Sequence, residues 1–483
     1  MEIIKSNKGG NKGFYKGYVY VVKYIGVSKI TWRCSQRCSM KCTGELYTDL
    51  KMENPEVKTG HSHLKDDDSV KIEKALCAMK ERSKAGLSKP LEVYAAEISK
   101  LDGNTRAKMP VEDHVKRTLR NQRSALNPVE PTSLDNLVID DEWCTTGHPE
   151  YENFLIFDNG INSEERILIF GTVEGMNNLS KSNTWYLDGN FSLAPKLFLQ
   201  LYVIRVEVDG IFITAIYCLL QRKTSETYKT VFRTLVEKCA EQNLYLDPKY
   251  VHLDFEKAVI KAVHKIFNKE VIIRGCFYHL SQSTHRKIQA LGLEKLYHED
   301  PNFTKFCGML DGLAFLPLTD VEQGMSYLRS IMPDTALDLV EYFDSTYVNG
   351  TFKRTNCPIN KIKFKKVQPR FPPSVWNVHE ATLNDQHRTN NTTEGWNHRF
   401  SNLVGHNHPS IWTLLKKMRL EVAVDDTKIR QYNLGTIQPV KKRKLTVKNQ
   451  NTLKRLCVDY NEGKRSIENF LDAISYNTRI KLD

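Results

Sequence analysis

Hydrophobic residues alternate or recur at helical spacing along most of the chain, and the pattern changes twice. Residues 14–32 are rich in Tyr, Val and Ile with Gly at the expected turns, which predicts two short strands. Between residues 69 and 124, apolar residues recur at the spacing of one helix face. It predicts three helices, at residues 69–83, 89–100 and 110–124.

From residue 165 onward, the predicted elements follow the order of a mixed α/β sheet. Three strands come first, then a helix, and then a strand, a helix and a strand. This is the order of an RNase H-like sheet, in which acids at the ends of the first and fourth strands come together in space. The predicted ranges are 184–188, 198–207 and 211–219 for the three strands, 224–243 for the helix, and 250–253, 256–267 and 270–275 for the last three elements.

A helical insertion is expected after the last of these strands, at about residues 285–388. The stretch is too long for a bare loop, and it contains helical patterns at 301–316, 320–332 and 335–347. A further helix is predicted from Trp412 to Val424. We therefore expect four parts: a small β-rich domain at 1–66, a helical, basic linker region at 67–145, an α/β domain with a helical insertion at 150–425, and a basic C-terminal tail at 426–483.

The charge of the chain is uneven. Lys and Arg outnumber Asp and Glu by 70 to 57 in 483 residues, a formal charge of +13. Residues 1–65 hold 12 basic and 5 acidic residues, and residues 427–483 hold 13 and 5, so both ends are basic. This favours nucleic acid as the partner, because cations that neutralise phosphates release counterions. The run Pro439–Leu445 is typical of a nuclear localisation signal or a phosphate-binding patch, and it predicts a nuclear protein.

Two other basic segments are candidates for contact with DNA. Residues 360–373 interleave basic residues with Phe, which suits stacking on unpaired bases and equally suits an ordinary surface loop. The helix at 110–124 ends with four cations that either bind phosphates or are ordinary solvated charges near a helix C-terminus. These four residues are Lys116, Arg117, Arg120 and Arg123.

The sequence argues against a secreted or membrane protein. The N-terminus lacks an apolar signal core. The most apolar stretch, Leu197 to Leu220, contains charged residues and suits a pair of strands better than a membrane span. Eleven cysteines without a secretory signal favour a reducing compartment, in which Cys is buried, catalytic or bound to metal.

Cysteines and histidines follow the predicted N-terminal strands at the spacing of metal ligands. Residues i and i+2 of an extended segment point to the same face, so His61 and His63 can reach one ion. Two thiolates and two imidazoles complete a tetrahedral zinc site, which would stabilise a domain too small for a large core. Cys34 and Cys38 have the usual spacing, and Cys42 lies close by, so spacing alone leaves the second thiolate open. The alternative is a small β domain with incidental Cys and His.

Residues 12–65 resemble the FLYWCH zinc finger. The order of the family's features is Trp-x-Cys, a second Cys before a short strand, and His-x-His. Here they are Trp32-Arg33-Cys34, Lys41-Cys42-Thr43 and His61-Ser62-His63. The resemblance implies a small antiparallel sheet that binds DNA or, in some members, proteins. It also implies that zinc is held by Cys34, Cys42, His61 and His63, with Cys38 as a spare.

Four later segments, in order, resemble the motifs of Mutator-like (MULE) transposases. They are residues 185–190 (WYLDGN), 251–258 (VHLDFEKA), 275–282 (GCFYHLSQ) and 389–397 (TNNTTEGWN). The resemblance implies a DDE-type transposase that cuts double-stranded DNA at transposon ends and transfers the strand into a target, with a homo-oligomer as a possible form. The alternative is a domesticated, non-catalytic zinc-finger DNA-binding protein or transcription regulator that keeps the fold.

The resemblance implies that Asp188, Asp254 and Glu394 are the catalytic acids and hold Mg²⁺ or Mn²⁺. Phosphodiester chemistry benefits from two ions that clamp the attacking and leaving oxygens, and such hard ions prefer carboxylates. Each acid also has a structural interpretation. Asp188-Gly189 suits a hairpin turn, Asp254 suits the N-cap of the next helix, and Asn391-x-x-Glu394 fits a capping box.

The Cys-x-x-His box of the third motif is formed by Cys276 and His279. The two residues follow a strand at a spacing that suits a turn into a helix, near the edge of the sheet that carries the acids. They are possible metal ligands, although two ligands alone do not make a zinc site. We expect a structural or DNA-positioning role for them.

Overall fold

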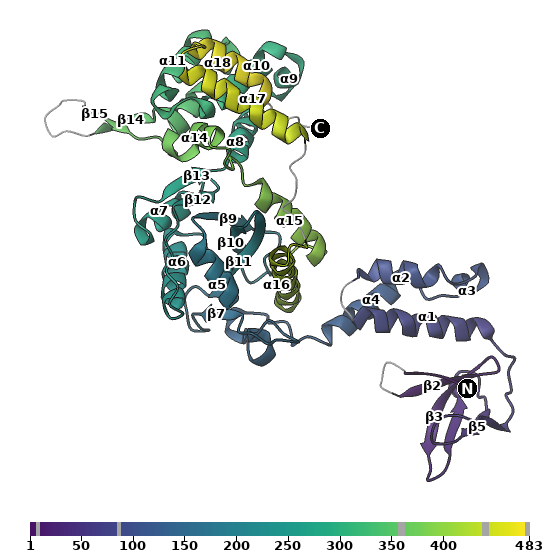
Figure 1. The fold of residues 1–483 in the computed structure, drawn as a ribbon. Helices are drawn as coiled ribbons and strands as arrows, with labels where there is room; N and C mark the ends of the chain where they lie inside the picture. The colour runs from purple at the N-terminus through teal and green to yellow at the C-terminus, as the bar shows by residue number, and fades with distance from the viewer. Residues whose placement is uncertain (6–9, 85–87, 356–362, 437–443, 479–483) are drawn as a thin grey trace. The chain divides into compact units, whose positions relative to one another are not determined.

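The computed structural model describes residues 1–5, 10–84, 88–355, 363–436 and 444–478. The chain divides into two compact units, Met1–Glu130 and Pro131–Asp483. Unit 1 begins with a six-stranded antiparallel sheet in which each strand pairs with the next along the chain (Figure 1). The strands are β1 (Glu2–Lys5), β2 (Asn11–Tyr15), β3 (Tyr18–Ile25), β4 (Ile30–Cys34), β5 (Glu45–Thr48) and β6 (Glu56–Thr59).

The tight turn between β2 and β3 lies at Lys16 and Gly17, whose φ angles of 52° and 82° are both positive. Positive φ at both central residues is the geometry of a two-residue hairpin turn. The segment 14–32 therefore holds parts of three strands rather than the two expected, because so short a turn hardly interrupts the hydrophobic pattern. Tyr20 and Trp32 form the buried centre of this small sheet.

The rest of unit 1 is helical, as predicted. Met79, Val93 and Leu119 come from three different helices and pack together with no exposed surface. A short additional helix separates the second and third predicted ones. The helices are α1 (Asp67–Lys84), α2 (Pro90–Ile98), α3 (Gly103–Ala107) and α4 (Glu112–Ser124).

Unit 2 contains a seven-stranded mixed sheet with the order β13-β12-β9-β10-β11-β8-β7. β12 is parallel to both of its neighbours, and all other neighbouring pairs are antiparallel. The five predicted strands are present, and β7 and β8 extend the sheet beyond them. The strands are β7 (Leu155–Asp158), β8 (Ile167–Phe170), β9 (Thr184–Asn190), β10 (Gln200–Val208), β11 (Ile211–Leu220), β12 (Tyr250–Leu253) and β13 (Ile272–Gly275).

Alternate residues of these strands face two separate cores, as the period of two in a strand requires. Trp185 and Leu187 of β9 pack on one side with α5 (Val173–Lys181), α6 (Ser225–Ala240) and α7 (Lys257–Ile266). The opposite face is covered by α15 (Asn391–Val404) and α16 (Ile411–Asn433), and Figure 1 shows the two groups of helices on either side of the sheet. Because Asp188 follows Leu187, it lies on the face that α15 and α16 cover.

A third core, formed by helices, fills the rest of unit 2 and includes the expected insertion. None of the helices that the structure describes in either unit is long and apolar enough to span a membrane. A separate two-stranded sheet is formed by β14 (Thr351–Thr355) and β15 (Lys363–Val367). The helices of this part are α8 (Phe277–Ala290), α9 (Glu294–Glu299), α10 (Pro301–Gly312), α11 (Val321–Ile331), α12 (Leu337–Phe343), α13 (Pro373–Trp376), α14 (His379–Leu383), α17 (Lys444–Asn461) and α18 (Ile467–Thr478).

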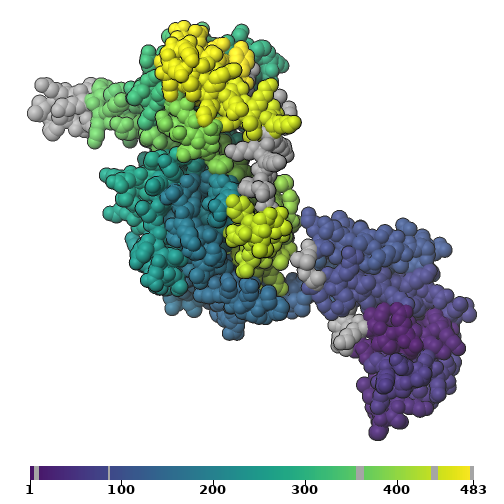
Figure 2. Space-filling view, in the orientation of Figure 1, coloured from purple at the N-terminus to yellow at the C-terminus, as the bar shows by residue number. Residues whose placement is uncertain are grey.

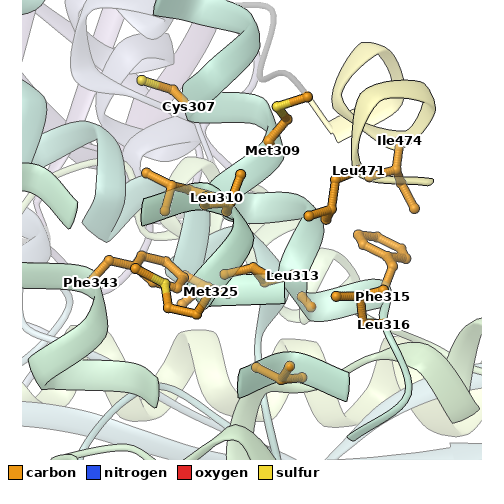
Figure 3. Packing of buried hydrophobic residues seen from close by; sticks show 14 of the residues in the cluster. Cys307, Met309, Leu310, Leu313, Phe315, Leu316, Met325, Phe343, Leu471 and Ile474 are labelled. Atoms are coloured by element: carbon orange, nitrogen blue, oxygen red, sulfur yellow. The ribbon is translucent and has the colours of Figure 1, made fainter. Parts of the chain in front are cut away.

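The last two helices, α17 and α18, belong to this core. Leu471 and Ile474 of α18 are fully buried beside Leu310 and Leu313 (Figure 3). The structure thus differs from the expectation of a basic tail at 426–483. The basic excess of this segment lies in α16, in α17 and the turn after it, and in residues 437–443 and 479–483, which are outside the described residues, whereas α18 contains no Lys or Arg.

Replacement of Leu471 by Ala tests whether α18 is an integral part of unit 2. The variant leaves a cavity among fully buried side chains, so we expect the free energy of unfolding to fall by about 2–5 kcal/mol. Glu468→Ala changes an exposed residue of the same helix and should stay within about 0.5 kcal/mol of the parent chain. Urea unfolding measures both variants, and equal stabilities would contradict the packing of α18.

Asp311 of α10 gives this core a dependence on pH. Burial raises the pKa of its carboxyl to about 7, and the hydroxyls of Thr284 and Ser281 lower it only in part. The folded state therefore holds a proton that the unfolded chain has released, and stability falls as pH rises from about 4 to 7. We expect Asp311→Asn, which stays neutral, to lack this decline of a few kcal/mol. Urea unfolding of both chains at pH 5 and pH 8 measures the difference, and parallel pH profiles would contradict it.

Candidate functional site

The first candidate site lies in the small sheet of unit 1. One ligand atom from each of Cys34, Cys42, His61 and His63 lies within 4.8 Å of the others. Cys34 ends β4, Cys42 precedes β5, and the two histidines follow β6, so the antiparallel pairing of these strands brings the four together. The set has the composition of a structural zinc site.

Each sulfur of this site faces one imidazole nitrogen. Cys34 Sγ lies 3.3 Å from His63 Nε2, and Cys42 Sγ lies 3.3 Å from His61 Nδ1. The outer nitrogens are also engaged, because His61 Nε2 lies 2.7 Å from the Tyr20 hydroxyl and His63 Nδ1 lies 2.8 Å from the Leu64 carbonyl. Such outer contacts fix the orientation of metal-binding histidines.

Backbone N–H groups favour a thiolate at Cys42. Burial raises the pKa of its thiol, but the N–H groups of Gly44 and Ser62, together with the side chains of Ser62 and Cys34, lower it more, to about 7. Burial raises the pKa of Cys34 to about 11, so this sulfur needs a nearby cation to ionise near neutral pH. Gly44 also gives the imidazole room, since a Cβ there would lie 2.7 Å from the His61 ring. The four side chains therefore fit Zn²⁺.

The choice between the cysteines is resolved by their positions. Cys38 is exposed and is not part of the group, whereas Cys42 is buried within it. Cys38 has the usual C-x2-4-C spacing from Cys34, but the 3₁₀ turn at Ser35–Arg37 carries the chain past the site before Cys42 returns to it. Cys34 and Cys42 are thus the two sulfurs that meet the histidines.

The second candidate site lies at the edge of the mixed sheet of unit 2. β12 pairs in parallel with β9, with Val251 opposite Trp185 and His252 opposite Tyr186. Continuing this register by two residues places Asp254, just past the end of β12, level with Asp188. Asp254 and Asp188 are each two positions after the His252–Tyr186 pair, so both lie on the same face of the sheet as that pair.

α15 brings Glu394 to the same place. Asn397, one turn after Glu394 on this helix, donates a hydrogen bond from Nδ2 to Asp188 Oδ2. His279 of α8 lies between the other two acids: its Nδ1 is 2.7 Å from Asp254 Oδ1, and its Nε2 is 3.9 Å from Glu394 Oε1. The contact with Asp254 is not aligned as a hydrogen bond, so it acts through charge.

The start of α15 is held by three hydrogen bonds to other elements. The Asn390 N–H donates to Cys276 Sγ at 3.2 Å, and the Asn390 side chain donates to the Leu187 carbonyl at 3.2 Å. Arg205 Nη1 donates to the Thr392 carbonyl at 2.9 Å. Cys276 therefore links β13 to the helix that carries Glu394, which gives the Cys-x-x-His box a positioning role. Sequence reasoning did not identify Asn390, Asn397 or Arg205, although both Asn residues stand in the motif TNNTTEGWN.

The three acids do not take the structural roles that the sequence also allowed. Asp188 and Gly189 lie inside β9, paired with Val203 and Tyr202, rather than in a turn. Asp254 precedes the N-cap of α7 and makes no capping bond to that helix, and the N-cap of α15 is formed without a side-chain bond. The carboxylates are thus not engaged in local capping or turn structure.

Burial, with a smaller contribution from a neighbouring carboxylate, raises the pKa of two of these acids. Burial raises the pKa of Asp188 to about 6, with a further contribution from Asp254. Burial and Asp254 also raise the pKa of Glu394. Burial lowers the pKa of His279, but Asp254 and Cys276 beside it raise it to about 11, so the imidazole is protonated and balances part of the negative charge.

Glu256 is separate from this group. Its carboxylate is half-buried and accepts a hydrogen bond from the Tyr228 hydroxyl at 3.0 Å. Cys276, His279 and Glu394 also offer three ligand atoms within 4.8 Å of one another, although Cys276 Sγ is already used by Asn390.

The four cations of α4 are in different surroundings. Lys116 pairs with Glu112 at 2.7 Å, and Arg123 donates to the Ser83 carbonyl at 3.0 Å, so Arg123 holds α4 against α1. Arg117 and Arg120 are exposed, and their contact with DNA stays a prediction. Most of the run Pro439–Leu445 and the start of the segment 360–373 lie outside the described residues.

Zinc content tests the ligand choice directly. Cys42→Ser should lose most of the bound zinc and destabilise the small sheet, because a hydroxyl is a poor replacement for a thiolate. Cys38→Ser is the matched control and should retain the zinc of the parent chain. Metal analysis of the purified full-length variants gives the answer, and zinc loss in Cys38→Ser with retention in Cys42→Ser would reverse the assignment.

Comparisons with known proteins match the two regions of the chain that carry most of these site residues. Residues 3–63 match the FLYWCH zinc finger domain, and residues 184–283 match the MULE transposase domain. The second match includes Asp188, Asp254, Cys276 and His279, and it ends before Glu394. No curated protein matches the chain. The chain therefore combines a FLYWCH zinc finger domain with a MULE transposase domain.

Proposed function

We propose that this chain is a DDE-type DNA transposase that binds double-stranded DNA at transposon ends, cuts it and transfers the freed strand into a target. The observation that carries the proposal is that Asp254 and Glu394 both lie beside His279, while Asp188 lies close enough to Asp254 for that carboxylate to raise its pKa. These acids come from three motifs in the order of the MULE family, and the first two lie within the matched domain.

The order of the strands supports an RNase H-like core. β11, β10, β9, β12 and β13 lie side by side in this order, with the first three antiparallel and the last two parallel to β9. The first and fourth strands of this series along the chain are β9 and β12. They are neighbours, and each leads to one of the proposed acids.

The acidic site fits hard divalent cations such as Mg²⁺ or Mn²⁺. Asp254 Oδ1 and Glu394 Oε1 are buried oxygens that accept no aligned hydrogen bond among the described residues, and the neighbouring group of both is the His279 imidazole, at 2.7 Å and 3.9 Å. Buried carboxylate oxygens normally have a partner, and oxygen ligands are what these ions prefer. Asp188, Asp254 and Glu394 would hold the ions. When bound, they would stabilise charge on the attacking and leaving oxygens of the phosphodiester.

The residues around the acids hold them in position for this chemistry. Asn397 orients Asp188, and the protonated His279 keeps Asp254 and Glu394 from moving apart. Cys276 and Asn390 fix the start of α15 relative to β9. The catalytic geometry thus depends on neutral donors and one imidazolium rather than on direct contact between the acids.

Two displacements at phosphorus complete the proposed reaction. Water first replaces the 3′-oxygen of the scissile bond, which leaves a 3′-hydroxyl on the transposon end and a 5′-phosphate on the flanking strand. The 3′-hydroxyl then replaces a 3′-oxygen in the target strand, which joins the two DNAs. The FLYWCH domain would bind DNA and the chain would act in the nucleus, with a homo-oligomer as the form that holds two transposon ends.

A cleavage assay tests the catalytic acids. The full-length chain is incubated with Mg²⁺ or Mn²⁺ and duplex DNA that carries the terminal sequences flanking its own coding region. Asp188→Asn, Asp254→Asn and Glu394→Gln should each lower the cleavage rate by about a hundredfold or more. The reason is that charge stabilisation at such sites contributes several kcal/mol, and each 1.4 kcal/mol is about a factor of ten.

Glu256→Gln is the matched control, because it removes a carboxylate two residues from Asp254 while the amide still accepts from Tyr228. It should cleave like the parent chain. Cleavage that persists in Asp188→Asn would overturn the assignment of the acids. Sequence-specific DNA binding without cleavage by the parent chain would instead support a domesticated, non-catalytic DNA-binding protein.

A further inference from the structure

The two-stranded ribbon β14–β15 stands apart from the sheet that carries the acids. Figure 1 shows it projecting from the helical part of unit 2, and Figure 2 shows its light-green atoms outside the body of neighbouring helices. At its base, Gly350 has a φ of 78°, and a Cβ there would lie 2.0 Å from the Val367 carbonyl oxygen. Only glycine permits this close approach, so the base of the ribbon is a defined structural feature.

The charge of the ribbon is entirely positive. None of the residues of β14 and β15 is acidic, and Lys353 lies directly opposite Lys365. Like charges opposite each other destabilise a strand pair, so packing of the ribbon itself does not explain them. The side chains of Lys353, Arg354, Lys365 and Lys366 are exposed, and none forms an ion pair with another described residue.

Two aromatic side chains are exposed on the same ribbon. Phe352 and Phe364 retain 68% and 67% of their surface in contact with solvent. Phe352 lies opposite Lys366, and Arg354 lies opposite Phe364. Residues that face each other across an antiparallel pair share a face, as do residues two positions apart. One face of the ribbon therefore alternates two phenylalanines with two cations, while Lys353 and Lys365 occupy the other face.

We propose that β14–β15 inserts into a groove of double-stranded DNA. The major groove admits a two-stranded β-ribbon, and cations on both faces can reach the phosphates of its two walls. The phenylalanines then contact base edges, where the thymine methyl group offers an apolar partner. Cations on two opposite faces suit a duplex better than a single strand, which presents only one backbone. This proposal goes beyond the acids and the zinc site, because neither includes the ribbon.

Binding to a short duplex of mixed sequence tests the ribbon without cleavage. The full-length chain is measured in EDTA-free buffer lacking divalent cations, between about 50 and 200 mM salt. The variant with Lys353, Arg354, Lys365 and Lys366 all changed to Gln should bind at least roughly tenfold more weakly at the lower salt. The slope of the logarithm of the binding constant against the logarithm of the salt concentration should also become shallower. We expect a change of about 0.9 for each phosphate that the variant no longer neutralises.

Two controls make the result specific. A chain with Lys249, Lys261, Lys265 and Lys269 changed to Gln removes the same charge from exposed positions elsewhere and should bind like the parent chain. Phe352→Ala with Phe364→Ala should weaken binding without changing the dependence on salt, since the charge of the ribbon is unchanged.

Three outcomes would overturn the proposal. They are unchanged binding by the ribbon variant, an equally weakened remote control, and weakening confined to single-stranded DNA of the same sequence. The residues changed are exposed, so thermal unfolding should match that of the parent chain in every variant. Because the assay measures binding alone, failure of the catalytic proposal would leave its result unaffected.

Discussion

The parallel pairing of β12 with β9 is the constraint on which the acidic site depends. It sets Asp254 level with Asp188 on one face of the sheet, and any shift of one residue would turn one carboxylate to the opposite core. The pairing also has a cost, because two acids near each other disfavour ionisation, and burial raises the pKa of Asp188 to about 6. The sheet thus fixes an arrangement that its own electrostatics opposes, as is common at functional sites.

The neighbouring elements offset the unfavourable ionisation of these neighbouring carboxylates. His279 contributes a positive charge next to Asp254, and Asn397 contributes a neutral donor to Asp188. α16 is itself fixed by charge, because Glu421, which has no exposed surface, pairs with Arg399 and accepts a hydrogen bond from Trp396 Nε1 at 2.9 Å. Since Arg399 and Trp396 belong to α15, this buried pair holds the two helices together. The position of Glu394 therefore depends on both faces of α15.

The sequence predicted the parts of the structure that depend on local pattern. Strand order alone placed Asp188 and Asp254 together. The FLYWCH resemblance selected Cys42 over Cys38, and Cys42 is the cysteine that lies in the buried group with Cys34, His61 and His63, which fits Zn²⁺. Partners that depend on side-chain direction were not predictable, such as Asn397 with Asp188 or Asn390 with Cys276, since about 200 and 100 residues separate them. The helices α17 and α18 were not predicted for a different reason. The basic excess of residues 427–483 favoured a tail, although α18 itself contains no Lys or Arg, and only the fold shows which face of each helix is buried.

The long insertion before Glu394 does not weaken its link to the other acids, because the insertion returns to its starting point. The Phe277 N–H, at the start of α8, donates to the Arg388 carbonyl at 3.0 Å, and the adjacent Cys276 accepts from Asn390. The chain therefore leaves the sheet after β13 and returns beside the same point, where these two hydrogen bonds join the two ends of the insertion. The helices between these contacts pack into a core of their own, which α17 and α18 complete. The number of residues between His279 and Glu394 is thus a poor guide to their distance in space. A helical insertion of any length whose two ends are joined by these two hydrogen bonds would leave Glu394 in the same place.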